Sequence, residues 1–173
     1  MSRIYLVGFM GAGKSTVGKR LAAVLNYHFL DLDDDFEESY KISISSFFKK
    51  YNESLFRKLE YQKLLDSLSR QNTVISTGGG TPCFFDSMDV MYANGTTVYL
   101  KMSPEGIASR LKTAKKKRPL VQSMKDEELL EFIKNKLEER KGFYEKAKIT
   151  INAINLNVNQ LSELIKKEIA SSL

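Results

Sequence analysis

Short apolar runs alternate along the chain with longer stretches in which apolar residues recur every three or four positions. The short runs are typical of strands and lie at 3–8, 28–32, 73–77, 96–101 and 148–152. The longer stretches are typical of helices and lie at 14–26, 34–40, 43–50, 53–70, about 84–93, 104–113, 125–147 and 158–171. Strands separated by helices favour βαβ units, so the pattern predicts an α/β fold with a parallel sheet.

The composition of the chain argues against several classes of protein, namely membrane-spanning, secreted and disulfide-bonded ones. The 173 residues suit a single domain, 1–173, and no apolar run reaches the roughly 18 residues that span a bilayer. The first apolar run leads directly into a glycine-rich segment, unlike a signal peptide. The single cysteine, Cys83, allows no internal disulfide and fits a reducing compartment. We therefore expect a cytoplasmic protein that does not bind a membrane.

The chain carries a net charge of +6, with 27 basic and 21 acidic residues. A nucleic-acid-binding face would spread this excess over a surface. The basic residues are instead densest in one cluster, Lys112, Lys115, Lys116, Lys117 and Arg118. Because an anionic substrate accounts for such a cluster equally well, we expect no nucleic-acid partner. We also expect a monomer.

The stretch Gly8–Thr16 fits G-x-x-x-x-G-K-[ST], the P-loop pattern, and lies between a predicted strand and a predicted helix. Glycines let backbone N–H groups close around phosphate oxygens, and the N-terminus of the following helix adds partial positive charge. Lys14 is expected to act catalytically on the β- and γ-phosphates, and the Ser15 hydroxyl to bind Mg²⁺. The predicted nucleotide-binding residues are Gly11, Ala12, Gly13, Lys14, Ser15 and Thr16.

Two acidic residues, Asp31 and Asp33, follow the second predicted strand. In an extended segment, residues spaced by two leave the chain on the same face. Asp31 is predicted to hold a Mg²⁺-bound water, and Asp33 to accept a hydrogen bond or a proton from an attacking hydroxyl. The alternative is an acid-rich helix start, to which we assign Asp34 and Asp35.

Three glycines, Gly78, Gly79 and Gly80, follow the third predicted strand. They leave backbone N–H groups uncovered, so the oxygen atoms of a ligand can approach closely. A triple glycine alone is usually a turn. Its place at the carboxyl end of a strand favours a role in substrate binding.

Two arginines, Arg57 and Arg140, each interrupt the apolar stripe of a predicted helix. A guanidinium that faces inward needs an anionic partner, which is either a protein carboxylate or a ligand. Glu60, one turn after Arg57, is a possible protein partner. The spacing of these residues leaves both interpretations open.

A segment rich in lysine, about 111–123, ends a predicted helix with charge and proline. Most charge runs are solvated faces, but a mobile lid over a polyanion would have the same composition. Arg118, which stands before a proline, is the candidate for a catalytic cation delivered by such a lid.

These motifs, in this order and over most of the chain, resemble the shikimate kinase family. The family combines G-x-x-G-x-G-K-S-T, D-x-D, F-R, G-G-G, R-P-L and a later arginine before an aromatic residue. The matching segments here are Gly8–Thr16, Asp31 with Asp33, Phe56 with Arg57, Gly78–Gly80, Arg118–Leu120, and Arg140 with Tyr144.

The resemblance implies a three-layer α/β/α kinase fold, similar to nucleoside monophosphate kinases, with a five-stranded parallel sheet in the order 2-3-1-4-5. It implies an ATP-dependent phosphotransferase that uses Mg²⁺ and phosphorylates the 3-hydroxyl of shikimate, in chorismate and aromatic amino-acid biosynthesis. The acceptor-binding region would then span about 31–61, and the lid about 111–123.

The resemblance also implies individual roles. Asp33 would hold the shikimate hydroxyl, and Arg57 and Arg140 would bind the carboxylate. Gly79 and Gly80 would offer backbone contacts. Two further arginines, Arg110 and Arg118, would lie on the nucleotide side. Whether Asp33 removes a proton or only positions the hydroxyl stays open.

One feature departs from the family pattern. Members often carry a basic residue after the last strand that packs on adenine, but residues 152–157 contain none. We therefore expect backbone and apolar contacts to the adenine. The lid is also richer in lysine than is usual in the family.

Other functions fit the sequence less well. A gluconate kinase, or another small-molecule P-loop kinase, would also need arginines for an anionic acceptor, but the D-x-D, F-R and G-G-G set favours shikimate. A GTPase-like switch would need D-x-x-G and N-K-x-D motifs, and neither occurs.

Overall fold

The computed structural model of the protein describes residues 2–114 and 124–171. Its sheet is parallel, with the strands in the order β2-β3-β1-β4-β5. This is the predicted order, so the fold expectation is confirmed. The strands are β1 (Arg3–Val7), β2 (His28–Asp31), β3 (Thr73–Ser76), β4 (Thr96–Lys101) and β5 (Ile149–Asn152).

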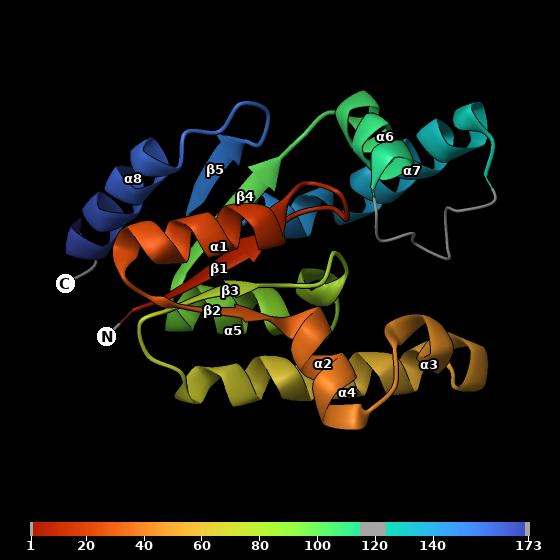
Figure 1. The fold of residues 1–173 in the computed structure, drawn as a ribbon, viewed down its shortest axis with the longest axis horizontal. Helices are drawn as coiled ribbons and strands as arrows, with labels where there is room; N and C mark the ends of the chain where they lie inside the picture. Colours follow the sequence, from red (N-terminus) through yellow and green to blue (C-terminus); the bar gives the residue numbers. More distant parts are fainter. Residues whose placement is uncertain (1, 115–123, 172–173) are drawn as a thin grey trace.

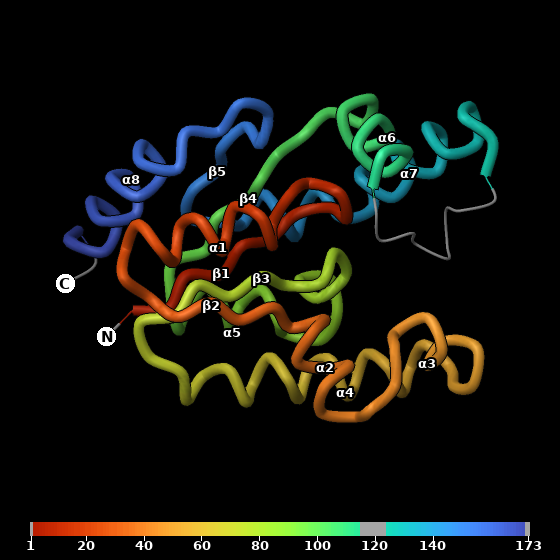
Figure 2. Tube along the Cα trace, viewed as in Figure 1, coloured from red at the N-terminus to blue at the C-terminus, as the bar shows by residue number. Residues whose placement is uncertain are grey.

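Helices cover both faces of this sheet and the rim at the carboxyl ends of its strands (Figures 1 and 2). They are α1 (Lys14–Leu25), α2 (Leu32–Tyr40), α3 (Ile44–Lys50), α4 (Glu53–Asp66), α5 (Ser87–Asn94), α6 (Pro104–Thr113), α7 (Asp126–Tyr144) and α8 (Val158–Ser171). Two short 3₁₀ turns, η1 (Ser67–Ser69) and η2 (Thr81–Cys83), follow α4 and β3.

The central strand β1 is buried on both faces, as its continuous apolar run predicts. Its alternate side chains separate into two clusters, because successive strand residues point to opposite faces. Ile4 and Leu6 pack with apolar residues of α1 and α8, whereas Tyr5 and Val7 pack with residues of α4, α5 and the end of α7. The helix α7 contributes to both clusters and so runs along the rim where the strands end.

A third cluster holds α2, α3 and α4 together beyond the β2 edge of the sheet (Figure 1). Its buried members are Phe36, Phe47 and Phe56, whose rings pack at tilted or edge-on angles. Each of these helices begins at a side-chain cap, which is Asp31, Ser43 and Asn52 respectively. This unit carries Asp33 and Arg57 into the rim.

Several predicted helix boundaries are wrong, among them the start of α2 at Leu32 rather than 34 and the end of α7 at Tyr144 rather than 147. The helix expected from about 84 begins at Ser87, because Phe85 adopts a positive φ of 53° and breaks the helical path. The helix expected over 53–70 leaves the α conformation at Asp66 and continues as η1. The start of α6 is as predicted, since Ser103 caps it ahead of Pro104.

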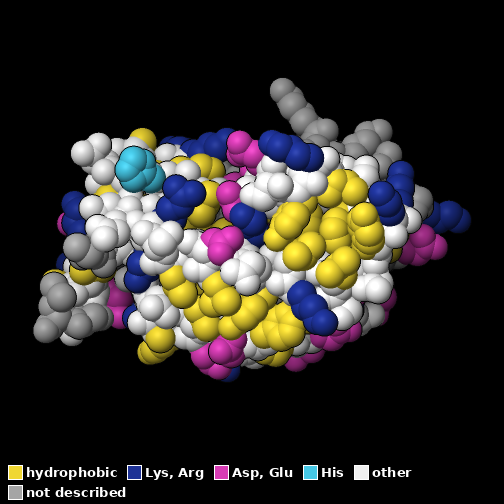
Figure 3. Space-filling view, turned by 90° about the horizontal axis from the view of Figure 1, so that it is seen from below, with side chains coloured by type: hydrophobic (Ala, Val, Ile, Leu, Met, Phe, Trp, Pro, Cys, Tyr) yellow, Lys and Arg dark blue, Asp and Glu magenta, His cyan; other side chains and the backbone are white. Residues whose placement is uncertain are grey.

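The face of the molecule shown in Figure 3 has no region of a single charge sign among the described side chains. On the face shown in Figure 3, basic and acidic side chains are interspersed between groups of hydrophobic ones. In the part of the chain that the structure describes, no helix is long and apolar enough to cross a membrane.

Candidate active site

A cavity of about 540 Å³ opens at the carboxyl ends of β1, β2 and β3. Ligands of open α/β sheets bind at this end of the strands. The cavity brings together the P-loop, the acidic pair and part of the glycine turn. Among its lining residues are Gly11, Gly13, Lys14, Ser15, Thr16, Asp31, Asp33, Gly79 and Arg110.

The P-loop adopts a conformation that depends on its glycines. Gly8 and Gly13 have φ values of 141° and 93°, which side chains other than glycine rarely adopt. The buried Lys14 donates hydrogen bonds to the carbonyl oxygens of Gly8 and Phe9, at 2.7 and 3.0 Å. The ammonium group is thus folded back over the loop, close to where phosphate oxygens would lie.

Beside the loop, Asp31 serves two purposes. One carboxylate oxygen caps α2 by accepting from the backbone N–H of Asp33 at 3.1 Å. The other accepts from the Ser15 hydroxyl at 2.5 Å. The helix cap therefore fixes a carboxylate next to the hydroxyl that was predicted to bind a metal.

The glycine turn 78–80 lies where the acceptor-side residues meet. A Cβ atom on Gly78 would lie 3.0 Å from an Asp33 carboxylate oxygen. On Gly79 it would lie 3.6 Å from an Arg140 nitrogen, and on Gly80 only 2.7 Å from an Arg57 nitrogen. Residues far apart in the sequence thus converge on one turn, where a Cβ atom on Gly78 or Gly80 would force neighbouring side chains to shift.

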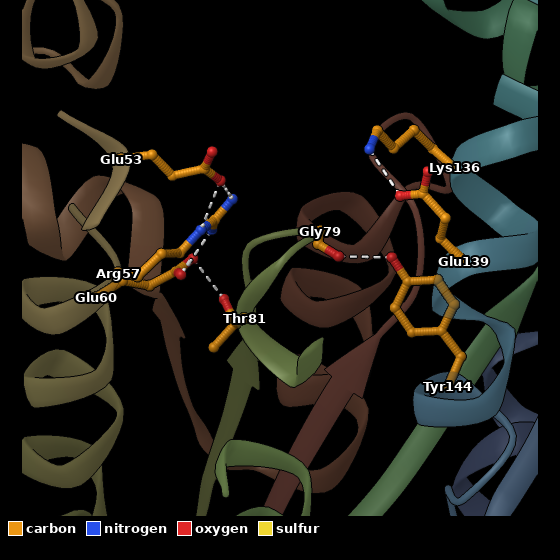
Figure 4. A network of polar contacts seen from close by, with 8 residues as sticks. All are labelled: Glu53, Arg57, Glu60, Gly79, Thr81, Lys136, Glu139 and Tyr144. Atoms are coloured by element: carbon orange, nitrogen blue, oxygen red, sulfur yellow. Dashed lines mark hydrogen bonds and ion pairs between the residues drawn. The ribbon is translucent and has the colours of Figure 1, made fainter. Parts of the chain in front are cut away.

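The two arginines differ in their protein partners. Arg57 pairs with Glu60 at 2.8 Å and with Glu53 at 3.0 Å (Figure 4). Burial alone would lower the pKa of Arg57, but these two carboxylates outweigh it and raise the pKa. Within residues 2–114 and 124–171, by contrast, Arg140 has no carboxylate partner, and its guanidinium lies 5.5 Å from the centre of the Phe9 ring.

Comparison with known proteins identifies this arrangement. The sequence profile described as shikimate kinase matches residues 10–170. A shikimate kinase from Parabacteroides distasonis is 44% identical over 171 residues, which cover 96% of this chain and 99% of that protein. The chain belongs to the shikimate kinase family.

Solved structures agree with this. A shikimate kinase from Bacteroides thetaiotaomicron has a TM-score of 0.92 at 42% identity, covering 95% of this chain and 98% of the other. The shikimate kinase from Acinetobacter baumannii, solved in complex with shikimate, has a TM-score of 0.85 at 34% identity, covering 99% and 94%.

Arg110, which the sequence predicts to lie on the nucleotide side, bridges two loops. It donates to the carbonyl oxygens of Ala12 at 3.0 Å and Ala153 at 3.2 Å. The same end of the cavity is lined by Ala153, Asn155 and Leu156. This surface fits the expected adenine contacts to backbone and apolar groups.

The lid lies mostly outside the described residues. Residues 111–113 form the last turn of α6, while Arg118 and the rest of 115–123 are not described. The role of Arg118 therefore stays a prediction.

Some contacts of this shikimate kinase site were not predicted from the sequence. Thr81 donates to Glu60 at 2.7 Å, and Tyr144 donates to the carbonyl oxygen of Gly79 at 2.5 Å. The spacing of Glu60, three residues after Arg57, indicates its pairing with Arg57 but not its contact with Thr81. No local pattern indicates the other two contacts, since their partners lie 21 and 65 residues away.

Cys83 lies close enough to both arginines for their charges to act on it. Burial raises the pKa of its thiol to about 11, and the charges of Arg140 and Arg57 offset only part of this effect. The thiol is therefore protonated at neutral pH, which argues against a nucleophilic role.

Proposed function

We propose that this chain transfers the γ-phosphoryl group of ATP directly to the 3-hydroxyl of shikimate, giving shikimate 3-phosphate and ADP. The observation that carries the proposal is the convergence of Asp33, Arg57 and Arg140 on the glycine turn next to the P-loop. A carboxylate beside two guanidinium groups suits a hydroxy acid, because the cations bind its carboxylate and the carboxylate holds its hydroxyl.

The donor half of the site is the P-loop. Backbone N–H groups of residues 11–16, at the start of α1, would surround the phosphates. Lys14 would exchange the carbonyl oxygens of Gly8 and Phe9 for phosphate oxygens. Arg110 and, from the lid, Arg118 would place positive charge beside the negative charge that develops on the transferring phosphoryl group.

The residues present also fit Mg²⁺. The Ser15 hydroxyl and the Asp31 carboxylate offer hard oxygen donors 2.5 Å apart. A magnesium ion takes few protein ligands and fills the rest of its shell with water and phosphate oxygens. We assign Ser15 as a direct ligand and Asp31 as a partner through water. The ion would neutralise charge on the β- and γ-phosphates.

The acceptor half would hold shikimate on the other side of the glycine turn. Arg57 and Arg140 would bind the carboxylate, and backbone groups of Gly78–Gly80 would contact the ring substituents. Asp33 would accept a hydrogen bond from the 3-hydroxyl. As the bond from this oxygen to phosphorus forms and the bond to the β-phosphate oxygen breaks, the hydroxyl proton passes to the Asp33 carboxylate or to solvent.

An acceptor panel tests the proposal. ADP release is measured with shikimate, gluconate or a nucleoside monophosphate as the acceptor. We expect a shikimate-dependent turnover of about 1–100 s⁻¹, typical of kinases, and only background with the others. ADP release with gluconate or a nucleotide but not with shikimate would contradict the proposal.

We also propose a monomer in the cytoplasm. All the residues assigned to the site come from one chain, and the single cysteine fits a reducing compartment. Light scattering should give a mass near the chain's 19.7 kDa, and cell fractionation should separate the protein from a membrane marker. A dimer mass, or co-fractionation with membranes, would contradict the respective point.

A further inference from the structure

The glycine turn is held from two walls of the site. On one side Thr81, directly after the turn, donates to Glu60 of α4, which in turn pairs with Arg57. On the other side Tyr144 of α7 donates to the carbonyl oxygen of Gly79 (Figure 4). These contacts from α4 and α7 therefore fix the orientation of the glycine turn.

Tyr144 makes this contact from a buried position, and its hydroxyl also interacts with the nearby Arg140. Its side chain is fully buried, and its ring stacks on Tyr99 with the ring centres 5.1 Å apart. Burial raises the pKa of its hydroxyl, so the group stays protonated and remains a donor. A buried, stacked ring thus holds the hydroxyl next to the carbonyl oxygen of Gly79.

The contact also sets the direction of a neighbouring N–H group. The bond between Gly79 and Gly80 is trans, so the carbonyl of Gly79 and the N–H of Gly80 point in opposite directions. A carbonyl held against α7 therefore directs the N–H of Gly80 away from α7. Gly79 itself lies between Met10 of the P-loop and Arg140, at the junction of the donor and acceptor halves.

We infer that Tyr144 is a positioning residue for shikimate binding: its hydroxyl fixes the Gly79–Gly80 peptide so that the N–H of Gly80 faces the acceptor carboxylate between Arg57 and Arg140. The inference rests on the proposed function. Tyr144 lies one helical turn after Arg140, so α7 delivers both a cation and the group that orients the turn.

The test is Tyr144→Phe, made in a Gly142→Ala background so that the variant stays folded. Gly142 is an exposed position of α7 with nothing within 4 Å of an added Cβ, and alanine there favours the helix. The control is Tyr99→Phe in the same background, which removes a hydroxyl from the stacked ring but keeps the contact to Gly79.

We expect Tyr144→Phe to raise the KM for shikimate about fivefold to tenfold, the loss of one hydrogen bond, while the KM for ATP stays within about twofold. The amide resonance of Gly80 should shift, and its response to added shikimate should shrink. Tyr99→Phe should change neither KM by more than about twofold.

An unchanged shikimate KM in Tyr144→Phe would overturn the inference, as would an equal loss for both substrates. These outcomes differ from a failure of the proposed function, in which the unmodified chain itself would release no ADP with shikimate.

Discussion

At the scale of single residues, the proposed function gives Asp33 the most specific role. Asp33→Asn keeps the size of the side chain but removes its charge, so it cannot accept the hydroxyl proton. We expect kcat to fall by about 10²–10³-fold, with the affinity for ATP nearly unchanged. Steady-state kinetics and ATP titration measure the two effects.

The matched control is Asp34→Asn, at the next, exposed position of α2. It should retain activity within about twofold, since surface substitutions have small effects. If Asp33→Asn weakened ATP binding as much as shikimate use, Asp33 would not belong to the acceptor half.

Residues in short motifs could be predicted from the sequence, and residues that act through distant contacts could not. Lys14, Ser15 and Asp31 lie together as the P-loop motif and the strand end indicate. The ion pair of Arg57 with Glu60 was one of two open interpretations, and it is present. This ion pair does not exclude the second interpretation, ligand binding, because a paired guanidinium still has N–H donors available for a ligand.

At the scale of secondary-structure elements, the glycine turn links the two halves of the site. Gly80→Ala would place a Cβ atom 2.7 Å from an Arg57 nitrogen that Glu60 and Glu53 hold in place. The guanidinium must move, so we expect the KM for shikimate to rise about tenfold while stability changes by about 1 kcal/mol or less. Kinetics and a thermal melt measure these quantities.

Gly142→Ala alone provides the control, because an added Cβ there has no neighbour within 4 Å. It should raise stability by about 0.5–1 kcal/mol and leave both KM values unchanged. A Gly80→Ala variant with native shikimate kinetics would show that the turn is not tightly coupled to Arg57.

Strands and most helices could be predicted because their hydrophobic periodicity reflects how each element packs on the sheet. Where a helix end differs from the prediction, its cause lies outside the local hydrophobic pattern. Phe85 takes a positive φ, and its ring packs on Tyr61, so the helix α5 starts only at Ser87. Such a turn is set by tertiary contacts rather than by turn-forming residues.

At the scale of the whole molecule, we expect the donor half to bind ATP and the acceptor half to bind shikimate independently, so that each binding can be measured without the other substrate. A ligand at 100 times its Kd stabilises the folded state by about 2.7 kcal/mol, or roughly 5–10 °C in Tm for a domain of this size. We expect ATP and shikimate each to produce such a shift in thermal melts.

Arg57→Ala should abolish most of the shikimate shift and keep the ATP shift, because Arg57 lies beside Gly80 and does not line the cavity around the P-loop. Loss of both shifts would mean that the substitution damages the whole fold. Lys58→Ala, at the neighbouring exposed position, is the control and should keep both.

The central claim is that the P-loop supplies the donor half of the site while Asp33, the glycine turn and the two arginines form the acceptor half. A crystal structure with shikimate and ADP bound tests it most directly. The account predicts the shikimate carboxylate between Arg57 and Arg140 and the 3-hydroxyl within hydrogen-bond distance of Asp33. Shikimate bound elsewhere, or with its carboxylate on other cations, would contradict it.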